Sequence, residues 1–174
     1  MPNCLAYDGG VTQSIGHALT EPARKLAEAV LHSRRFARAP ISLYRVGLGF
    51  VFGSRMLMLE HVGRRTGARR YVVLEVVDQP SPDVYVVPSG FGEGSQWFRN
   101  VMAEPEVKVS VGVRRSVAAT ARRLSAAEAD AALQRYIGRH PRAWASLKEV
   151  IERTLGGRVD PPNTELPMVE LRCA

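Results

Sequence analysis

The sequence has little cysteine and no long uninterrupted apolar segment. Its two cysteines, Cys4 and Cys173, lie near opposite ends of the 174 residues, so they provide neither a disulfide framework nor a multi-cysteine metal site. The apolar stretch 41–59 is interrupted by Arg45 and Arg55, whereas a membrane-spanning helix needs ~20 nearly uncharged residues. The N-terminus lacks the pattern of a secretory signal. We therefore expect a cytoplasmic protein without a spanning helix.

The signatures of several common enzyme classes are also missing. The four histidines have no metal-ligand spacing, so the sequence predicts no metal site and each histidine is interpreted as a packing or surface residue. There is no Gly-x-Ser-x-Gly elbow, no Walker loop and no Gly-x-Gly-x-x-Gly between a predicted strand and helix. Hydrolase, phosphotransferase and Rossmann functions therefore lose support, and no catalytic acid, base or nucleophile is predicted.

What the sequence does contain is an ordinary apolar fraction and an excess of positive charge. Apolar residues make up 45% and charged residues 24%, which is typical of a soluble globular protein with one core. The net charge is +7. The basic residues gather in three clusters: Arg24, Lys25, Arg34, Arg35 and Arg38; Arg64, Arg65, Arg69 and Arg70; and Arg114, Arg115, Arg122 and Arg123. Basic residues alternating with stacking aromatics are not evident, so no nucleic-acid partner is predicted.

The first cluster falls on a predicted helix that begins after Thr20 and has Pro22 in its first turn. Its basic side is either a solvated face or a peripheral attachment to an anionic membrane, and both interpretations stay open. This helix divides the chain into a basic helical extension, residues 1–40, and a main domain, residues 41–174.

Residue alternation and turn signals predict an α+β main domain. Strands are expected at 55–62, 71–77, 84–88, 107–111, 116–122 and 168–172. The strand at 71–77 is almost continuously apolar, which predicts cover on both faces, and Pro80–Asp83 predicts a turn. Helices are expected after Ser95 as N-cap until Pro105, from the Ser125–Glu128 capping box to Gly138, and from about Pro141 to Gly156.

Two segments have the composition of a ligand site. The segment Gly63-Arg64-Arg65-Thr66-Gly67-Ala68-Arg69-Arg70 connects two predicted strands, and its guanidinium groups suit phosphate or carboxylate oxygens. A soluble basic hairpin is the alternative. The segment from Ser89 to Asn100 runs through a glycine-rich loop into the N-terminus of a predicted helix, where backbone amides are free to meet an anion. Taken alone, Trp97 is interpreted as core packing.

Together the two segments resemble the deazaflavin-dependent nitroreductases, also called F420-dependent quinone reductases. The resemblance runs from about Leu57 to Val111 and extends weakly to Leu171. It is carried by a Gly-Arg-basic-Thr-Gly turn with a trailing basic residue, a strand-end serine, and Trp-x-x-Asn before x-x-Pro. In this sequence these features are Gly63 to Gly67, Arg70, Ser89, Trp97, Asn100 and Pro105.

The resemblance implies a split β-barrel with flanking helices that binds coenzyme F420 and transfers its hydride to a small organic acceptor. It implies that the anionic coenzyme tail is held by Arg64, Arg65, Thr66 and Arg70. It places along the cofactor groove Val72, Val73, Leu74, Ser89, Gly90, Gln96, Trp97 and Asn100. The cofactor carries the chemistry, which agrees with the lack of catalytic groups.

The acceptor is left open among quinones, nitroaromatics and conjugated enones. Some family members have a basic residue at the position of Gly90, and the stretch 140–146 lacks the tyrosines of nitroimidazole-reducing members. Tyr136, His140 and Trp144 are weaker candidates for an acceptor pocket, although helical spacing favours packing for Tyr136 and Trp144. An FMN-binding split barrel and a non-catalytic carrier of cofactor or lipid are the alternative functions.

Overall fold

The structure, a computed structural model, describes residues 54–174, so the segment 1–40 and its predicted helix lie outside the described residues. The strands are β1 (Met56–Val62), β2 (Arg69–Glu75), β3 (Asp78–Ser81), β4 (Val84–Pro88), β5 (Glu106–Val111), β6 (Arg114–Arg123) and β7 (Met168–Cys173). The helices are η3 (Gly92–Gly94), α3 (Gln96–Ala103), α4 (Ala126–Arg139) and α5 (Pro141–Leu155). No helix within residues 54–174 is long and apolar enough to cross a membrane.

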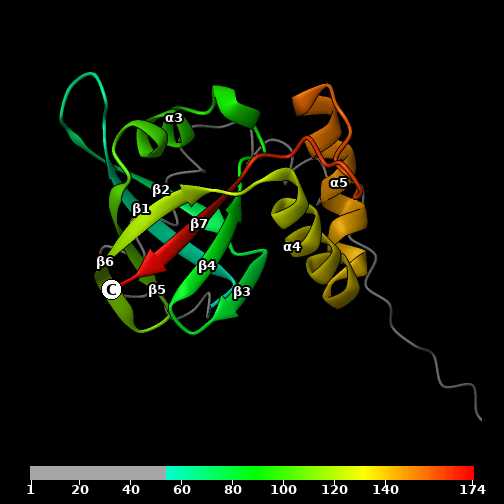
Figure 1. Cartoon of the computed structure of the whole chain (residues 1–174), viewed down its shortest axis with the longest axis horizontal. Helices are drawn as coiled ribbons and strands as arrows, with labels where there is room; N and C mark the ends of the chain where they lie inside the picture. Colours follow the sequence, from blue (N-terminus) through cyan, green and yellow to red (C-terminus); the bar gives the residue numbers. More distant parts are fainter. Residues whose placement is uncertain (1–53) are drawn as a thin grey trace, which may run out of the picture.

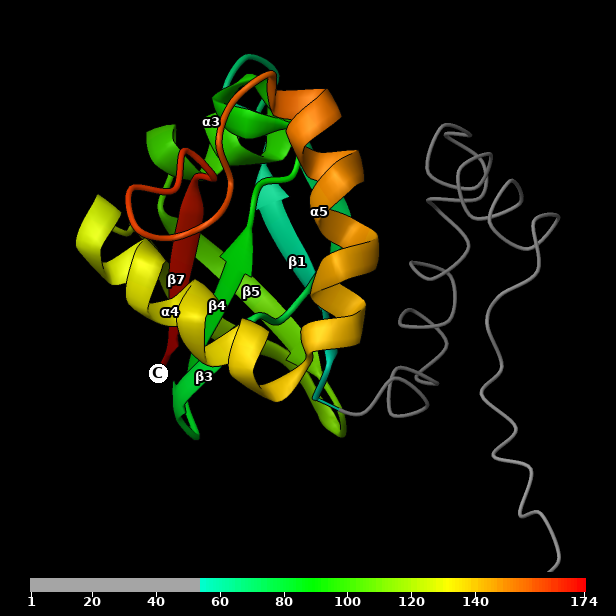
Figure 2. The same cartoon turned by 90° about the vertical axis from the view of Figure 1, so that its right-hand side faces the viewer.

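The strands form one curled antiparallel sheet in the order β2-β1-β5-β6-β7-β4-β3. Figure 1 shows the sheet wrapping around α3, while α4 and α5 lie together beside β3 and β4. Figure 2 shows this helix pair from its own side. The curl brings β2 close to β4 although the two strands are not paired. This arrangement is the predicted split β-barrel with flanking helices, so the fold prediction is confirmed.

Two apolar cores lie on the two faces of β4. Tyr85 and Val87 join the core inside the curl, together with Leu59, Phe98 and Val109. Val86, which points the other way, joins a second core beneath α4 and α5 that includes the buried residues Leu133, Tyr136, Val159, Leu166 and Met168. A strand that is covered on both faces has a continuous apolar sequence, which explains Val84-Tyr85-Val86-Val87.

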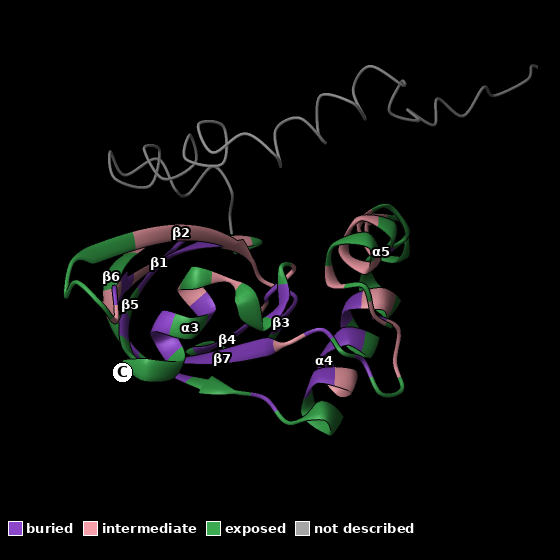
Figure 3. Cartoon of the chain, turned by 90° about the horizontal axis from the view of Figure 1, so that it is seen from above, coloured by how far each residue is buried: buried purple, intermediate pink, exposed green. Residues whose placement is uncertain are grey.

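The expectation that 71–77 is covered on both faces was wrong. The strand is β2, which ends at Glu75 and lies at one edge of the sheet. Figure 3 shows β2 half-buried or exposed, in contrast to the buried β4 and β7. Because an edge strand has a neighbour on one side only, part of its apolar surface remains open.

The predicted turn at Pro80–Asp83 was also partly wrong, because Pro80 and Ser81 belong to β3. The turn itself contains only Pro82 and Asp83. Strand β3 is the other edge of the sheet and pairs with β4 alone. Proline lacks a backbone donor and is tolerated at such an edge.

The three main helices begin where the sequence predicts, but α4 ends at Arg139 and not at the predicted Gly138. The Ser125–Glu128 capping box is present, with the Ser125 N–H donating to Glu128 Oε2 at 2.8 Å. Helix α5 begins at Pro141 and ends at Gly156, whose φ of 69° favours glycine. Helix α3 begins after Ser95, although the Ser95 side chain makes no capping bond. These ends fix the position of α3 within the curl and of α5 over the second core.

A buried carboxylate attaches α4 to the sheet. Asp78, at the start of β3, is 3% exposed. It accepts bonds from Arg135 Nη2 and from Arg139 Nη2, each at 2.7 Å. Arg139 also donates to the carbonyl of Val77 at 3.1 Å. One acidic residue thereby holds two turns of α4 against the edge of the sheet.

Candidate functional site

The β1–β2 connection is a tight turn built on glycine. Gly63 N donates to Ala68 O at 2.9 Å, and Gly67 N donates back to Gly63 O at 2.8 Å. Gly67 has a φ of 63°, which favours glycine. A Cβ on Gly63 would lie 2.7 Å from Arg70 Nε and 2.9 Å from Thr66 Oγ1, so any larger residue would displace these two side chains.

Asn100 of α3 fixes the position of this turn. Its side-chain oxygen accepts from the Arg64 backbone N at 3.2 Å and from Arg64 Nη1 at 2.8 Å. Arg64 Nη1 also donates to Gln96 Oε1 at 3.2 Å. Asn100 is 3% exposed, so its two bonds to Arg64 are partly buried, whereas the bond from Arg64 to Gln96 is exposed. The two predicted segments, far apart in sequence, therefore meet through Arg64.

His61, near the end of β1, extends this hydrogen-bond network. It is 4% exposed, and its Nδ1 lies 3.3 Å from Asn100 Nδ2. An amide nitrogen only donates, so Nδ1 accepts and the ring carries its proton on Nε2. Burial is the largest effect and lowers the pKa of His61. A backbone hydrogen bond at Val62 raises this pKa, and the positive charge of Arg70 lowers it further. The imidazole is therefore neutral at pH 7. Sequence reasoning classed His61 as structural and missed that it supports this site.

Acidification is expected to destabilise the protein through His61. Because the folded-state pKa lies below the ordinary value of 6.5, the unfolded chain binds the proton first, and stability falls as the pH drops from 6.5 through the folded pKa. His61→Gln keeps an acceptor for Asn100 but does not titrate. We expect urea unfolding of this variant to show a smaller loss of stability over that pH range than the unmodified protein. An equal loss in both proteins would show that His61 does not contribute.

Three arginines of the turn face a cavity without acidic partners. Arg64, Arg65, Thr66 and Arg70 line a cavity of about 180 Å³ together with Gly63, Gln96 and Asn100. Within residues 54–174, no carboxylate pairs with Arg64, Arg65 or Arg70, whereas Arg69 pairs with Glu60 at 3.5 Å. Clustered guanidinium groups without counterions favour a bound anion. The structure thus brings Arg64, Arg65, Thr66 and Arg70 together around one cavity, and the binding of an anion there stays a prediction.

The loop after β4 is closed by a buried serine. Ser89 is 0% exposed, and its hydroxyl lies 2.7 Å from the Gly92 carbonyl and 2.9 Å from Ser95 Oγ. Its backbone N–H donates to Pro167 O at 2.8 Å. All these contacts are within the protein, so Ser89 shapes the loop that carries Gly90 and leads into α3. A direct contact between this hydroxyl and a cofactor stays a prediction.

The predicted groove residues of β2 divide between two faces. Val72 and Leu74 pair with Leu59 and Leu57 of β1 and pack against the inner core. Val73 pairs with Met58 and lies on the opposite face, because side chains alternate along a strand. A ligand on one face of β2 therefore contacts Val72 and Leu74 or Val73, but not all three side chains.

The side chain of Trp97 is partly packed against the core and partly exposed. It is half-buried against the inner core, with its ring centroid 5.9 Å from that of Phe98 in an edge-on arrangement. The packing expected of Trp97 is thus present, and part of its indole stays accessible. One residue before it, Gln96 already contributes to the arginine-lined cavity.

An apolar cavity of about 190 Å³ lies between α5 and the ends of β2 and β4. Its walls come from the following residues: Glu75, Val77, Pro88, Gly90, Phe91, Leu133, Tyr136, Trp144, Leu147, Val150, Ile151, Thr154 and Leu166. Gly90 lies beside α5 in this cavity, and a Cβ there would make an ordinary contact with Ile151 Cγ1 at 4.0 Å. Of the residues predicted from the sequence, Gly90, Tyr136 and Trp144 line this cavity. His140 does not; it is exposed, and its ring centroid lies 5.3 Å from that of Tyr136.

The polar groups of this cavity are paired. Tyr136 donates to Glu75 Oε1 at 2.8 Å. Burial, followed by this bond, raises the pKa of Tyr136 to about 12, so its hydroxyl keeps its proton. Trp144 Nε1 donates to Asp160 Oδ1 at 3.1 Å. Both aromatic rings are therefore held in fixed orientations while their apolar faces form cavity wall.

A sequence profile decides the family. The profile described as F420H(2)-dependent quinone reductase matches residues 37–161. The chain belongs to this family. The resemblance inferred from the basic turn and the Trp-x-x-Asn helix is thereby confirmed, and F420-dependent reductases are oxidoreductases. Among curated proteins, none matches this chain.

Three solved structures are similar to this chain, and the first of them supports its fold. One described as a domain-swapped dimer is 18% identical with a TM-score of 0.52, covering 87% of this chain and 99% of that one. An F420-H2 dependent reductase, FDR-A, is 21% identical with a TM-score of 0.47, covering 68% and 94%. The protein Atu2129 from Agrobacterium tumefaciens, of unknown function, is 18% identical with a TM-score of 0.49, covering 78% and 55%.

Proposed function

We propose that this family member binds coenzyme F420 with its anionic tail at the β1–β2 turn and reduces a small apolar acceptor, with quinones as the first candidates. The observation that carries the proposal is the group Arg64, Arg65 and Arg70 around one cavity, for which residues 54–174 provide no carboxylate partner. An anionic tail of phosphate and glutamate groups is the ligand chemistry that such a group suits.

Strand β2 gives the direction in which the coenzyme would lie. Arg70, near its start, lines the cationic cavity, and Glu75, at its end, lines the apolar one. Five residues of extended strand span about 17 Å, so a coenzyme with its tail at Arg70 can lie along β2 with its ring system directed toward the apolar cavity but outside it. Half-exposed Val72, Val73 and Leu74 lie between Arg70 and Glu75.

The chain's own residues would bind, orient and exclude water. The turn arginines hold the tail, and Asn100 holds Arg64 in place. Tyr136 keeps its proton on Oη toward Glu75, and the apolar walls around it limit access of water. The bound reduced deazaflavin supplies the hydride, so no acid or nucleophile of the chain is needed for that transfer.

The apolar cavity limits the acceptor to small, flat, neutral molecules. A cavity of ~150 Å³ lined by aliphatic and aromatic side chains admits benzene, so about 190 Å³ admits one substituted ring. Quinones, nitroaromatics and conjugated enones of that size all remain substrates to test. Quinones fit well because their ring is flat and uncharged and the walls are almost wholly apolar.

Titration with F420, with FMN as the parallel ligand, tests the cofactor. Saturable binding of F420 alone, followed by fluorescence or calorimetry, is the expected result. Binding of FMN alone would contradict the proposal and indicate a flavin-dependent reductase. Binding of F420 without reduction of any quinone, nitroaromatic or enone would favour a carrier over an enzyme.

A bulky side chain on α5 tests the acceptor cavity separately. Val150 lines it, and Val150→Phe is expected to raise the KM for a quinone about tenfold or more, since burial of an apolar ring contributes ~1.5–3 kcal/mol. The Kd for F420 should stay unchanged. Ala145→Phe, at an exposed position of the same helix, is the control and should leave both constants alone. Loss of F420 binding in Val150→Phe would instead place the coenzyme in this cavity.

A further inference from the structure

The apolar cavity opens beside an exposed aromatic residue. Of the residues that line it, only Phe91 and Thr154 are exposed, and the others are buried or half-buried. Phe91 lies in the glycine-rich loop after β4, and Thr154 belongs to the last turn of α5. The Thr154 hydroxyl donates to the Val150 carbonyl at 2.8 Å, so its proton is already engaged. The mouth of the cavity therefore lies between this loop and the end of α5, and Phe91 is its exposed apolar side.

Packing within the protein does not account for Phe91. The residue is 63% exposed and belongs to neither apolar core of residues 54–174. An apolar ring that faces water is stabilised when another apolar group covers it. Because Phe91 also lines the cavity, an apolar group that projects from the cavity would cover this ring.

The backbone around Phe91 is held in a tight turn. Gly92 N donates to Ser89 O at 2.8 Å, which closes the turn around Phe91. Gly92 has a φ of 66°, and a Cβ on it would lie 2.9 Å from Leu155 Cδ2, so glycine lets the turn lie directly against α5. The backbone of Phe91 is thereby fixed beside the cavity, and its ring has a defined place at the mouth.

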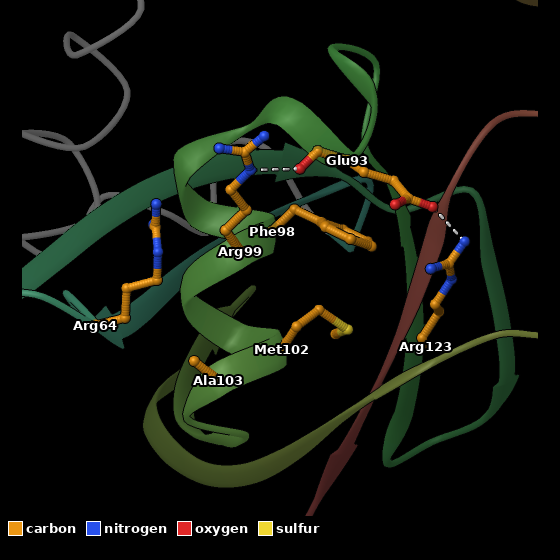
Figure 4. Close-up of a pocket in the computed structure, with 7 residues that line it drawn as sticks. All are labelled: Arg64, Glu93, Phe98, Arg99, Met102, Ala103 and Arg123. Atoms are coloured by element: carbon orange, nitrogen blue, oxygen red, sulfur yellow. Dashed lines mark hydrogen bonds and ion pairs between the residues drawn. The ribbon is translucent and has the colours of Figure 1, made fainter.

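Glu93 fastens the same loop to α3 and β6. Figure 4 shows both contacts: Arg99 Nε of α3 donates to the Glu93 backbone carbonyl at 3.1 Å, and Arg123 of β6 pairs with the Glu93 carboxylate. The side chains of Glu93 and Arg123 are 57% and 53% exposed, so this ion pair contributes little to the stability of the whole protein. Its effect is local, because it restricts the loop two residues after Phe91.

We propose that Phe91 is a specificity-determining residue, which selects acceptors with an apolar substituent over acceptors with a polar substituent of the same size, and that Glu93 is its positioning residue. The inference rests on the proposed function and deepens it. A cavity of about 190 Å³ takes up one substituted ring, so a longer substituent leaves through the mouth. There an apolar substituent covers Phe91, whereas a polar one loses water and meets no free hydroxyl proton on Thr154.

The test compares a pair of quinones with the same ring, one carrying a butyl chain and the other a methoxyethyl chain with as many heavy atoms. In the unmodified protein the KM should be about fivefold lower for the butyl compound, because a partly buried ether oxygen loses its bond to water. In Phe91→Ala the ratio of the KM values should approach unity, and Phe91→Leu should retain part of it. Glu93→Gln should reduce the ratio about twofold, the scale of an exposed ion pair. The kcat should be the same for both compounds, since their rings are identical.

Val113→Ala is the matched control. Val113 is an exposed apolar residue in the β5–β6 turn and does not line the cavity, so this variant should keep the preference for the butyl compound. Equal KM values in the unmodified protein, or an unchanged ratio in Phe91→Ala, would overturn the inference while the proposed function stands. A higher Kd for F420 in Phe91→Ala would place Phe91 against the coenzyme and overturn it as well. Reduction of no acceptor would overturn the proposed function and this inference with it.

Discussion

Replacing Arg64 and Arg65 by alanine is expected to weaken F420 binding by at least about a hundredfold. Both residues line the cavity of the β1–β2 turn without a carboxylate partner among residues 54–174. Charge-assisted hydrogen bonds contribute ~1.5–3 kcal/mol each, so losing two corresponds to ~3–6 kcal/mol, and ~1.4 kcal/mol is tenfold in Kd. Calorimetric titration of the double variant measures the change directly.

The same turn offers a matched control. Arg69 adjoins Arg70 in sequence, but its guanidinium pairs with Glu60 and lines a different cavity. Arg69→Ala removes the same charge from the same hairpin and should change F420 affinity only slightly, through weaker long-range attraction. Equal effects of Arg69→Ala and of the double variant would show that net charge, not the built site, governs binding. Unchanged affinity in the double variant would remove both arginines from the site.

The largest effect on stability is expected for Asp78→Asn, at about 2–3 kcal/mol. The carboxylate is 3% exposed and accepts bonds from Arg135 on Oδ2 and from Arg139 on Oδ1, so the amide nitrogen of Asn would face one of these two arginines as a donor against a donor. Breaking a fully buried pair costs ~3–5 kcal/mol. The loss here is smaller because the two arginines are 53% and 49% exposed and can return to water. Denaturant unfolding followed by circular dichroism measures it.

Asp83→Asn serves as the isosteric comparison. Its carboxylate pairs with Arg114 at 2.7 Å, but its side chain is 56% exposed. An exposed pair contributes less than ~1 kcal/mol, so this variant should unfold close to the unmodified protein. If both variants lost the same stability, the burial of Asp78 would not be the cause.

Local signals in the sequence predicted most elements of the fold. Strand β4 matches its predicted bounds, and the capping box at Ser125 begins α4 as expected. These signals succeed because capping and alternation depend on neighbours a few residues away. Strand β3 was missed because Pro80 and Ser81 are typical turn residues, and only their place at a sheet edge makes them tolerable in a strand.

The resemblance predicted the residues of the candidate site but not the hydrogen bonds that connect them. The basic turn and the Trp-x-x-Asn helix were identified in the sequence, and the structure brings them together through Arg64 and Asn100. The support from His61 could not be foreseen, because His61 and Asn100 are 39 positions apart in the sequence and only the fold of the sheet around α3 brings them together. Likewise, pattern alone did not show that Ser89 is wholly buried.

The strand order has a consequence for how the molecule is assembled. Within residues 54–174, strand β7 lies between β6 and β4 and is the one strand that joins the β3–β4 hairpin to the four strands β2-β1-β5-β6. Until residues 168–173 pair, these strands form two separate pieces. The apolar cavity, whose walls include β4 and the helices that follow β6, therefore needs the pairing of β7. Such distant pairing slows folding, and the rate at which β7 docks should limit the rate at which this cavity forms.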